Sequence, residues 1–340
     1  MKTLIIKTYK NLLPIVLREK ISILREGFSN SFKYLLRSIK FIVFNFFWIT
    51  PKELKMVDKI KNNHESKKKE IIEKGGKIAD YESLIKFKKS DTLFILGSGS
   101  SINDISESQW AEIKKHDSIG FNLFILHSFI PTYYHLEFTE ELYSYYKEIL
   151  DAKLEQLDEV PLLTNYYHVD AKRPLSDYFW LKNNLITNAY YMYSYEKKIT
   201  KLLKYFYSQE NAKDINFTIH YRGSLTLMMS LGVLLGYKNI VLMGIDLNNN
   251  EYFFHNESLY HSELERKVRN YHLAKLEELR VNNKMANVHG TIDKSLSDVI
   301  MTIDKFILIY KKIIQSKKVN ILLGSKKSFL ESILEQYNFK

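Results

Sequence analysis

The sequence Asp91-Thr-Leu-Phe-Ile-Leu-Gly-Ser-Gly-Ser-Ser-Ile102 decides the fold class of this 340-residue chain. Residues 92–96 are an apolar, β-prone run that is typical of a fully buried strand. Gly97 and Gly99 permit a tight turn after it, in which backbone N–H groups can face outward. A strand, a glycine–serine turn and a helix N-terminus together favour a site for a phosphate or carboxylate. The alternative is that the glycines only turn the chain.

Two serines follow the turn. Ser100 and Ser101 can cap a helix that begins near Ile102. No third glycine stands at position 102, so the stretch departs from the G-x-G-x-x-G pattern of dinucleotide sites. It therefore predicts an anion-binding α/β protein and leaves the anion open.

Apolar and helical patterns alternate along the rest of the chain. Apolar runs predict strands at residues 117–122, 131–138, 160–164, 239–243 and 319–323. Helical spacing predicts helices at residues 107–115, 140–157, 194–207, 225–235, 259–281, 296–315 and 327–337. This order predicts an α/β fold, a Rossmann-like parallel sheet flanked by helices on both faces.

Ligands bind at the carboxyl ends of the strands in such sheets. The informative residues are therefore expected where strands end. In this chain these positions are Gly97–Ser101, Asn122, Glu137 and Gly244–Asp246.

The charge is unevenly distributed. The chain carries a net charge of +11, yet residues 1–90 hold 21 Lys/Arg and 9 Asp/Glu, whereas residues 91–340 hold 29 and 30. A near-neutral main domain argues against a nucleic-acid partner, which needs basic residues on that domain's own surface. The absence of cysteine excludes disulfides and thiolate metal sites and allows a cytoplasmic location.

Residues 1–50 predict a basic amphipathic arm. Apolar residues recur at helical spacing from Ile21 to Ile42, basic residues are interspersed, and the arm ends in the aromatic run Phe41–Ile49. That run is about half of the ~20 residues needed to span a bilayer. We expect the arm to lie on an anionic membrane surface, with the protein cytoplasmic and peripherally associated with the inner membrane. The alternative is a helix packed on the protein itself or on a partner subunit.

The remaining chain divides in two. Residues 51–90 predict a solvated helical linker, and residues 91–340 predict the catalytic domain. Within that domain, residues 247–290 are polar and interspersed with aromatic side chains, which is typical of a lid that closes over a ligand. The alternative is that these aromatic side chains only pack on the domain.

The cofactor is constrained by what the sequence lacks. A nicotinamide enzyme would place Asp or Glu after the second strand, where this chain has Asn122. The chain has no Asp-x-Asp, no phosphate-binding P-loop and no His-Glu-x-x-His. Serine and glycine turns without a metal suit a donor with a single phosphate, so we expect neither a cofactor nor a metal.

A second motif covers residues 221–246 and reads Tyr-Arg-Gly-Ser-Leu-Thr-Leu-Met-Met-Ser-Leu-Gly-Val-Leu-Leu-Gly-Tyr-Lys-Asn-Ile-Val-Leu-Met-Gly-Ile-Asp. It resembles the central motif of the bacterial glycosyltransferase family 42 sialyltransferases, in which a small-residue turn opens an apolar helix and Gly-Ile-Asp closes the next strand. The first strand and turn are similar to that family's Gly-Asn-Gly-Pro-Ser, and Asn122 is similar to its asparagine after strand two. The resemblance runs from about residue 92 to 338 and extends to related flagellin-modifying transferases.

The resemblance implies a GT-A-variant fold and a metal-independent, inverting transfer of sialic acid from CMP-sialic acid. Ser98, Ser100 and Asn122 would contact the nucleotide, and Arg222 and Ser224 the sugar carboxylate or phosphate. The full set of donor-binding residues that it implies is Gly97, Ser98, Gly99, Ser100, Ser101, Asn122, Arg222, Gly223, Ser224, Gly244 and Asp246.

Two catalytic residues follow from the same resemblance. His289, in Asn287-Val-His-Gly-Thr-Ile-Asp293, is similar to the family's catalytic histidine and would take the acceptor's proton. The alternative is a surface or capping histidine. The family uses two tyrosines after Gly-Ile-Asp to assist phosphate departure, and here only Tyr252 matches. Asn248, His255 or Tyr260 could replace the other.

The roles of two further residues, Asp246 and Glu137, stay open. Asp246 binds a ribose or satisfies backbone N–H groups at the strand end. Glu137 lies near the place of a sugar-binding asparagine, where a carboxylate would repel an acidic sugar.

The sequence therefore predicts a glycosyltransferase that moves sialic acid or a related nonulosonate from a CMP-sugar to a cell-surface glycan, in lipooligosaccharide or capsule. The acceptor is a glycan or glycolipid, and a homo-oligomer fits the resemblance. The alternatives are a CMP-Kdo or other nonulosonate transferase, including one that modifies flagellin or another protein, and a non-catalytic nucleotide-binding assembly module.

Overall fold

The computed structural model describes residues 51–138, 142–165, 184–187, 190–191, 196–207, 215, 218–281 and 301–340. The chain divides into two compact units, residues 1–55 and 56–340. The predicted membrane arm at residues 1–50 lies outside the described residues, and so does His289. Within the part of the chain that is described, no helix combines the length and the apolar composition that a membrane crossing needs.

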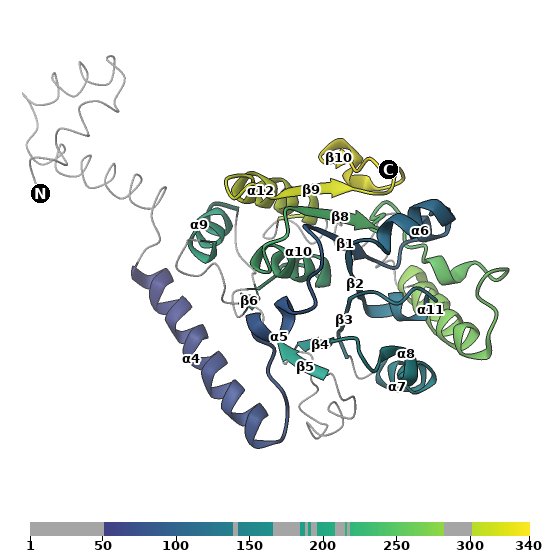
Figure 1. The fold of residues 1–340 in the computed structure, drawn as a ribbon, viewed down its shortest axis with the longest axis horizontal. Coiled ribbons are helices and arrows are strands. Elements are labelled where there is room, and N and C mark those ends of the chain that lie inside the picture. The colour runs from purple at the N-terminus through teal and green to yellow at the C-terminus, as the bar shows by residue number, and fades with distance from the viewer. Residues whose placement is uncertain are drawn as a thin grey trace, which may run out of the picture. The chain divides into compact units, whose positions relative to one another are not determined.

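A parallel sheet organises the larger unit (Figure 1). Its eight strands follow the spatial order β10-β9-β8-β1-β2-β3-β4-β5, and every neighbouring pair is parallel. The strands are β1 (Thr92–Leu96), β2 (Asp117–Phe121), β3 (Tyr133–Leu136), β4 (Leu162–Asn165), β5 (Asn184–Thr187), β8 (Asn239–Met243), β9 (Asn320–Leu323) and β10 (Glu335–Gln336). A second small sheet pairs β6 (Tyr190–Tyr191) with β7 (Ile219–His220). The predicted parallel α/β fold is confirmed.

Helices cover both faces of the large sheet. One face carries α9 (Glu196–Phe206), α10 (Ser224–Leu234) and α12 (Ile303–Gln315), and the other carries α6 (Glu107–Ile113), α7 (Tyr143–Ala152) and α11 (Glu263–Val281) (Figure 1). The shorter elements are α5 (Tyr81–Ile85), α8 (Leu154–Leu157) and the 3₁₀ turns η1 (Ser100–Asp104), η2 (Asn122–Leu126), η7 (Phe253–His255) and η9 (Phe329–Ser332). The helix α4 (Pro51–Glu73) begins in the first unit.

Successive side chains of β1 point alternately into two hydrophobic cores, one on each face of the sheet. Leu93 and Ile95 belong to the core beneath α10, whereas Phe94 and Leu96 belong to the core on the opposite face. Successive side chains of a strand point to opposite faces, so a strand covered on both sides is apolar throughout. All five residues of β1 are buried, as the uninterrupted apolar run predicts.

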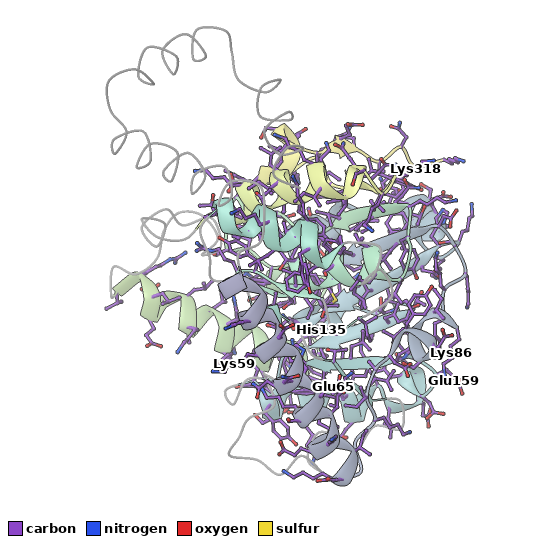
Figure 2. All side chains as sticks on the ribbon, turned by 90° about the vertical axis from the view of Figure 1, so that its left-hand side faces the viewer. Lys59, Glu65, Lys86, His135, Glu159 and Lys318 are labelled. Atoms are coloured by element: carbon purple, nitrogen blue, oxygen red, sulfur yellow. The ribbon has the colours of Figure 1, made fainter. Side chains whose placement is uncertain are left out.

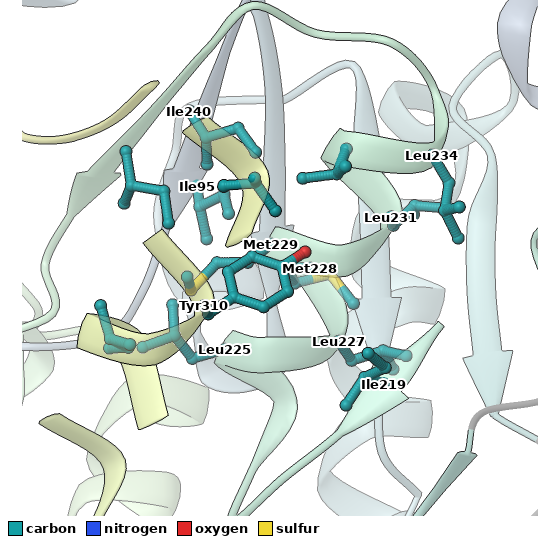
Figure 3. Close-up of a cluster of buried hydrophobic side chains, with 14 of the residues drawn as sticks. Ile95, Ile219, Leu225, Leu227, Met228, Met229, Leu231, Leu234, Ile240 and Tyr310 are labelled. Atoms are coloured by element: carbon teal, nitrogen blue, oxygen red, sulfur yellow. The ribbon is translucent and has the colours of Figure 1, made fainter. Parts of the chain in front are cut away.

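The helix α10 is buried on every side. All eleven of its residues are buried, which explains why its sequence is apolar all round. Figure 3 shows Met228 and Met229 packed near Ile95 of β1 and Tyr310 of α12. Within this layer Tyr207 bonds Ser230 at 2.6 Å and Tyr310 at 2.7 Å, so its polar atoms are satisfied.

Part of the predicted linker belongs to the domain instead. Lys59 and Glu65 on α4 are exposed, as expected of a solvated helix (Figure 2). Further along, Ile78 forms a parallel bridge with Ile186, and the Leu84 side chain is fully buried. Tyr133 Oη donates to the Leu84 carbonyl at 3.0 Å. The prediction of a solvated linker is therefore wrong at Ile78 and Leu84, because Ile78 pairs with the edge strand β5 and Leu84 fills the core.

The polar interior of the sheet includes His135. This side chain is fully buried in the middle of β3, within the body of the domain (Figure 2). It lies within the predicted strand at residues 131–138, which in the structure is the shorter β3.

The predicted C-terminal helix at residues 327–337 is wrong. The segment instead forms the short turn η9 and the edge strand β10, which pairs with β9. The Tyr337 and Phe339 rings lie 5.2 and 6.2 Å from the Phe94 ring between centroids. Packing of these aromatic rings on the core overrides the helical spacing of the segment.

Candidate active site

A cavity of about 530 Å³ opens where β1, β2, β3 and β8 end. Its volume lies within the range of small-molecule sites. The chain order of the sheet reverses at β1, because β2 to β5 lie on one side of it and β8 to β10 on the other. Ligands of open α/β sheets bind in the crevice at such a reversal.

Most of the predicted donor-binding residues line this cavity. They are Ser98, Gly99, Asn122, Arg222, Gly223, Ser224, Gly244 and Asp246, together with the predicted catalytic Tyr252. Gly97, Ser100 and Ser101 are not among the lining residues. The structure thus brings together residues from four separate segments of the chain.

The glycine–serine turn does not present its backbone donors as expected. The Gly97 N–H donates to the Met243 carbonyl at 2.8 Å, and the Gly99 N–H to the Gly244 carbonyl at 2.9 Å. The Ser100 N–H donates to the Glu251 carbonyl at 3.2 Å. The expectation that these N–H groups face outward to an anion is therefore wrong, because they join the turn after β1 to the segment after β8.

Asp246 completes this junction. Its carboxylate accepts the Ser101 N–H at 2.9 Å, the Ser101 hydroxyl in a short hydrogen bond, and the Ser100 hydroxyl at 3.4 Å. The side chain is only 4% exposed. Of the two roles considered for Asp246, the structure contains the second, an acceptor for a backbone N–H, while the residue also borders the cavity.

This arrangement corrects the predicted helix cap. The serines lie in η1, whose N-terminus has no side-chain cap, and the first α-helix after β1 begins only at Glu107 with Ser106 as its N-cap. Gly99 is needed for a different reason from the one expected. A Cβ atom there would lie 2.6 Å from the Asp246 carboxyl carbon, so only glycine lets the two segments approach.

Asn122 connects the ends of β2 and β3 to α10. Its Nδ2 donates to Ser224 Oγ at 2.9 Å, and its Oδ1 accepts the Glu137 N–H at 3.1 Å. The Glu137 carboxylate lies 3.0 Å from His220 Nε2. The Glu137 charge is thus offset when His220 is protonated, and the Asn122 amide is held in one orientation.

The backbone around the cavity is strained. Four non-glycine residues of the described chain have positive φ, and three of them line the cavity. Asn122 has a φ of 51°, Arg222 of 56° and Leu247 of 62°. A positive φ is energetically unfavourable for a residue with a Cβ atom. Such a conformation is kept only where the surrounding structure holds it, and it is common at functional sites.

The first part of the predicted lid is anchored to the domain. Tyr252 forms an antiparallel bridge with Gly99, and the Phe253 N–H donates to the Ser98 carbonyl at 3.0 Å. Phe253 and Phe254 are fully buried. Burial raises the pKa of the Tyr252 phenol, which therefore stays protonated at neutral pH.

Helix α11 lies within the predicted lid at residues 247–290 and supplies one wall of the cavity, through residues that the sequence analysis did not single out. Val268, Tyr271, His272 and Lys275 line the cavity. Their spacing of i, i+3, i+4 and i+7 marks one face of a helix. The spacing was visible in the sequence, but a 19-residue charged helix gave no sign of which face meets the domain.

Two histidines meet behind this wall. His255 Nε2 lies 3.1 Å from His272 Nδ1, and His255 Nδ1 accepts the Tyr252 N–H at 3.4 Å. Burial, with a smaller effect of the Arg269 charge, lowers the pKa of His255 to about 4. His255 is therefore neutral at pH 7.

The predicted base His289 lies in residues 282–300, outside the described chain, and its role stays a prediction. That segment joins α11 to α12, and both helices contribute residues to the cavity wall. Among the described residues, no group of three or more His, Asp or Glu side chains is placed to hold a metal ion.

No protein-family model matches this chain, and no curated protein matches it. Among solved structures, a variant of the sialyltransferase Cst-II in complex with CMP is similar over 73% of this chain and 86% of its own, with 14% identity and a TM-score of 0.42. The monofunctional α-2,3-sialyltransferase Cst-I from Campylobacter jejuni is similar over 74% and 83%, with 16% identity and a TM-score of 0.41. Neither likeness assigns an activity to this chain.

Proposed function

We propose that this chain is a metal-independent, inverting glycosyltransferase that moves sialic acid or a related nonulosonate from a CMP-sugar to a glycan. The observation that carries the proposal is the convergence of four segments on one cavity at the sheet reversal: residues 98–99, Asn122, residues 222–224 and residues 244–246. These are the segments on which the sequence resemblance depends, and they lie up to 148 positions apart.

The cavity offers donors suited to a phosphate or carboxylate. Arg222 carries five N–H donors in a planar fork that matches such oxygens. Ser224 Oγ accepts from Asn122 Nδ2, so its own hydroxyl hydrogen can turn to a ligand. Both groups would stabilise the negative charge that grows on the phosphate as the bond to the sugar breaks.

In the proposed transfer the acceptor hydroxyl attacks the anomeric carbon from the face opposite the phosphate. The carbon–oxygen bond to the phosphate breaks, and its electron pair leaves with CMP. The hydroxyl proton passes to a base, for which we propose His289, because an imidazole titrates near neutral pH. CMP departs with one phosphate, so hydrogen-bond donors can carry its charge without a metal.

Glu137 requires compensation if the sugar is acidic. A lone carboxylate in the cavity would repel the sugar carboxylate. The pairing with His220 at 3.0 Å offsets that charge when His220 is protonated. We therefore propose that the Glu137 carboxylate serves as the hydrogen-bond partner of His220, and that the cavity can still bind a CMP-sugar with an acidic sugar.

The proposal extends to the cellular setting. The excess of basic residues in residues 1–90 supports an arm that holds the enzyme at the cytoplasmic face of an anionic membrane, beside a glycan or glycolipid acceptor for lipooligosaccharide or capsule. A homo-oligomer belongs to the same proposal.

Isothermal titration of the full chain with CMP, UDP and GDP tests the donor class. We expect CMP to bind at least about tenfold more tightly than the other two, with EDTA present. Ser224→Ala should weaken CMP, whereas Ser258→Ala, at an exposed serine outside the cavity, should not. Equal affinity for the three nucleotides, or no binding of CMP, would contradict the proposal.

A further inference from the structure

We propose that a second cavity, beside α6 and separate from the candidate active site, binds a neutral disaccharide segment of a glycan. This cavity has a volume of about 630 Å³, which lies within the range of small-molecule sites. It shares no lining residue with the candidate active site. Its lining residues are Glu107, Trp110, Ala111, Lys114, His127, Ser128, Phe129 and Ile130. That this glycan is the acceptor of the transfer rests on the proposed function.

One wall of this second cavity is a single face of α6. The four lining residues of the helix stand at positions 107, 110, 111 and 114, and their spacing of i, i+3, i+4 and i+7 places them on one side of it. Ile113, on another side, is fully buried in the core. Trp110 is only partly buried, so it packs on the core and also borders the cavity.

Aromatic rings give this cavity an apolar lining. The Trp110 ring lies 4.9 Å from the His127 ring and 4.8 Å from the Phe129 ring between centroids, with interplanar angles of 29° and 31°. Rings that lie so nearly parallel present a broad apolar surface to a ligand. The C–H face of a pyranose ring packs on such a surface, because it is the apolar side of an otherwise hydroxylated molecule.

The same cavity offers one hydrogen-bond donor of known identity. The Phe129 N–H donates to His127 Nδ1 at 3.0 Å, so Nδ1 carries a lone pair. Burial, with a smaller effect of the Lys153 charge, lowers the pKa of His127 to about 4, so at pH 7 the ring is neutral and its proton is on Nε2. Among the described residues this Nε2–H has no acceptor, and the atom is not sealed from solvent. A sugar hydroxyl in the cavity can therefore accept from it.

Two charged side chains of opposite sign stand at the two ends of the α6 wall. Glu107 and Lys114 are seven residues apart, which corresponds to about 10 Å along the helix. Both are exposed, and within the described part of the chain neither forms an ion pair. A carboxylate accepts hydrogen bonds from hydroxyl groups and an ammonium donates to them. Because the two charges cancel, this wall favours a neutral ligand that carries hydroxyls along the length of two sugar rings.

The tryptophan indole signals of the full chain test the site. The chain has three tryptophans, and in protein labelled with ¹⁵N-tryptophan the Trp110 signal is the one that disappears in Trp110→Phe. The wild-type protein is titrated with three neutral disaccharides, namely lactose, maltose and N,N′-diacetylchitobiose. We expect at least one of them to shift the Trp110 signal saturably, with a dissociation constant in the millimolar range.

Variants at the ends of the α6 wall keep this reporter. Because Glu107 and Lys114 are exposed, Glu107→Ala and Lys114→Ala should fold as the wild type does. Each should raise the dissociation constant of the disaccharide about tenfold or more, the loss expected from one hydrogen bond with a charged group. Lys147→Ala is the matched control, at an exposed lysine of α7 that does not line the cavity. All three variants should bind CMP as the wild type does.

A Trp110 signal that none of the disaccharides moves would overturn the inference and leave the proposed function standing. An unchanged disaccharide affinity in both Glu107→Ala and Lys114→Ala would do the same. A shift with N-acetyltryptophanamide alone, an aromatic probe without sugar hydroxyls, would also overturn it by assigning the cavity to an aromatic peptide. A Trp110 signal that responds to a disaccharide in a protein that does not bind CMP would contradict the proposed function and support the sugar site.

Discussion

The hydrogen bonds between Ser101 and Asp246 predict that Asp246 stabilises the fold. A stability measurement therefore distinguishes this structural role of Asp246 from a role in binding a ligand. Asp246→Ala would leave the Ser101 N–H and hydroxyl without their acceptor at a site that is almost fully buried. An orphaned buried donor costs about 1–3 kcal/mol. Because the cavity can admit water on one side, we expect Asp246→Ala to lower the free energy of unfolding by about 2–4 kcal/mol.

Ser101→Ala should cost less. Asp246 would keep the Ser101 N–H and the Ser100 hydroxyl as donors, so we expect a loss of about 1 kcal/mol. The double variant should be less destabilised than the two single variants together, with a coupling energy of about 1 kcal/mol or more. The assay is urea unfolding followed by far-UV circular dichroism and tryptophan fluorescence, with cytidine and CMP affinities measured in parallel.

An unchanged unfolding midpoint in Asp246→Ala, or a coupling energy below about 0.5 kcal/mol, would refute this reasoning. Loss of nucleotide affinity at full stability would instead assign Asp246 to a ribose.

Three more predictions follow. His289→Ala should lower the rate of sugar transfer by about 10²-fold or more while leaving CMP affinity within about twofold; an unchanged rate would indicate a non-catalytic module or another base. Deleting residues 1–50 should release the protein from anionic vesicles at moderate salt, because the basic arm carries the attraction; co-sedimentation of the truncated protein would exclude that role. Stability should fall as the pH drops from about 6.5 to about 4, because burial lowers the pKa of both His127 and His255 to about 4, so in this window the unfolded chain binds protons that the folded chain does not. Denaturant titrations across this range check the slope, which the double variant His127→Gln/His255→Gln should flatten.

The parts of the fold that could be predicted are those in which burial leaves a pattern in consecutive residues of the sequence. The strands β1 and β8 are apolar runs because both of their faces are covered, and α10 is apolar because it is buried all round. Parallel strands end at the same edge of a sheet, so the strand order alone brought Ser98, Asn122 and Asp246 to one cavity.

The parts that failed depend on contacts between distant residues. The hydrogen bond from Ser101 to Asp246 joins positions 145 residues apart, and no local pattern shows that the turn donates to the protein itself. The strand β10 replaced a helical pattern because Tyr337 and Phe339 pack on Phe94. The predicted lid included α11, but the face of this helix that lines the cavity was not predicted, because spacing defines a helix face and not its partner.

A crystal structure of the full chain with CMP tests the central claim most directly. We predict that CMP occupies the cavity at the ends of β1, β2 and β8, with its phosphate bonded to the side chain of Arg222 or Ser224, while the N–H groups of Gly99 and Ser101 stay bonded to Gly244 and Asp246. CMP bound elsewhere, or a phosphate seated on the N–H groups of Gly97, Gly99, Ser100 or Ser101, would contradict it.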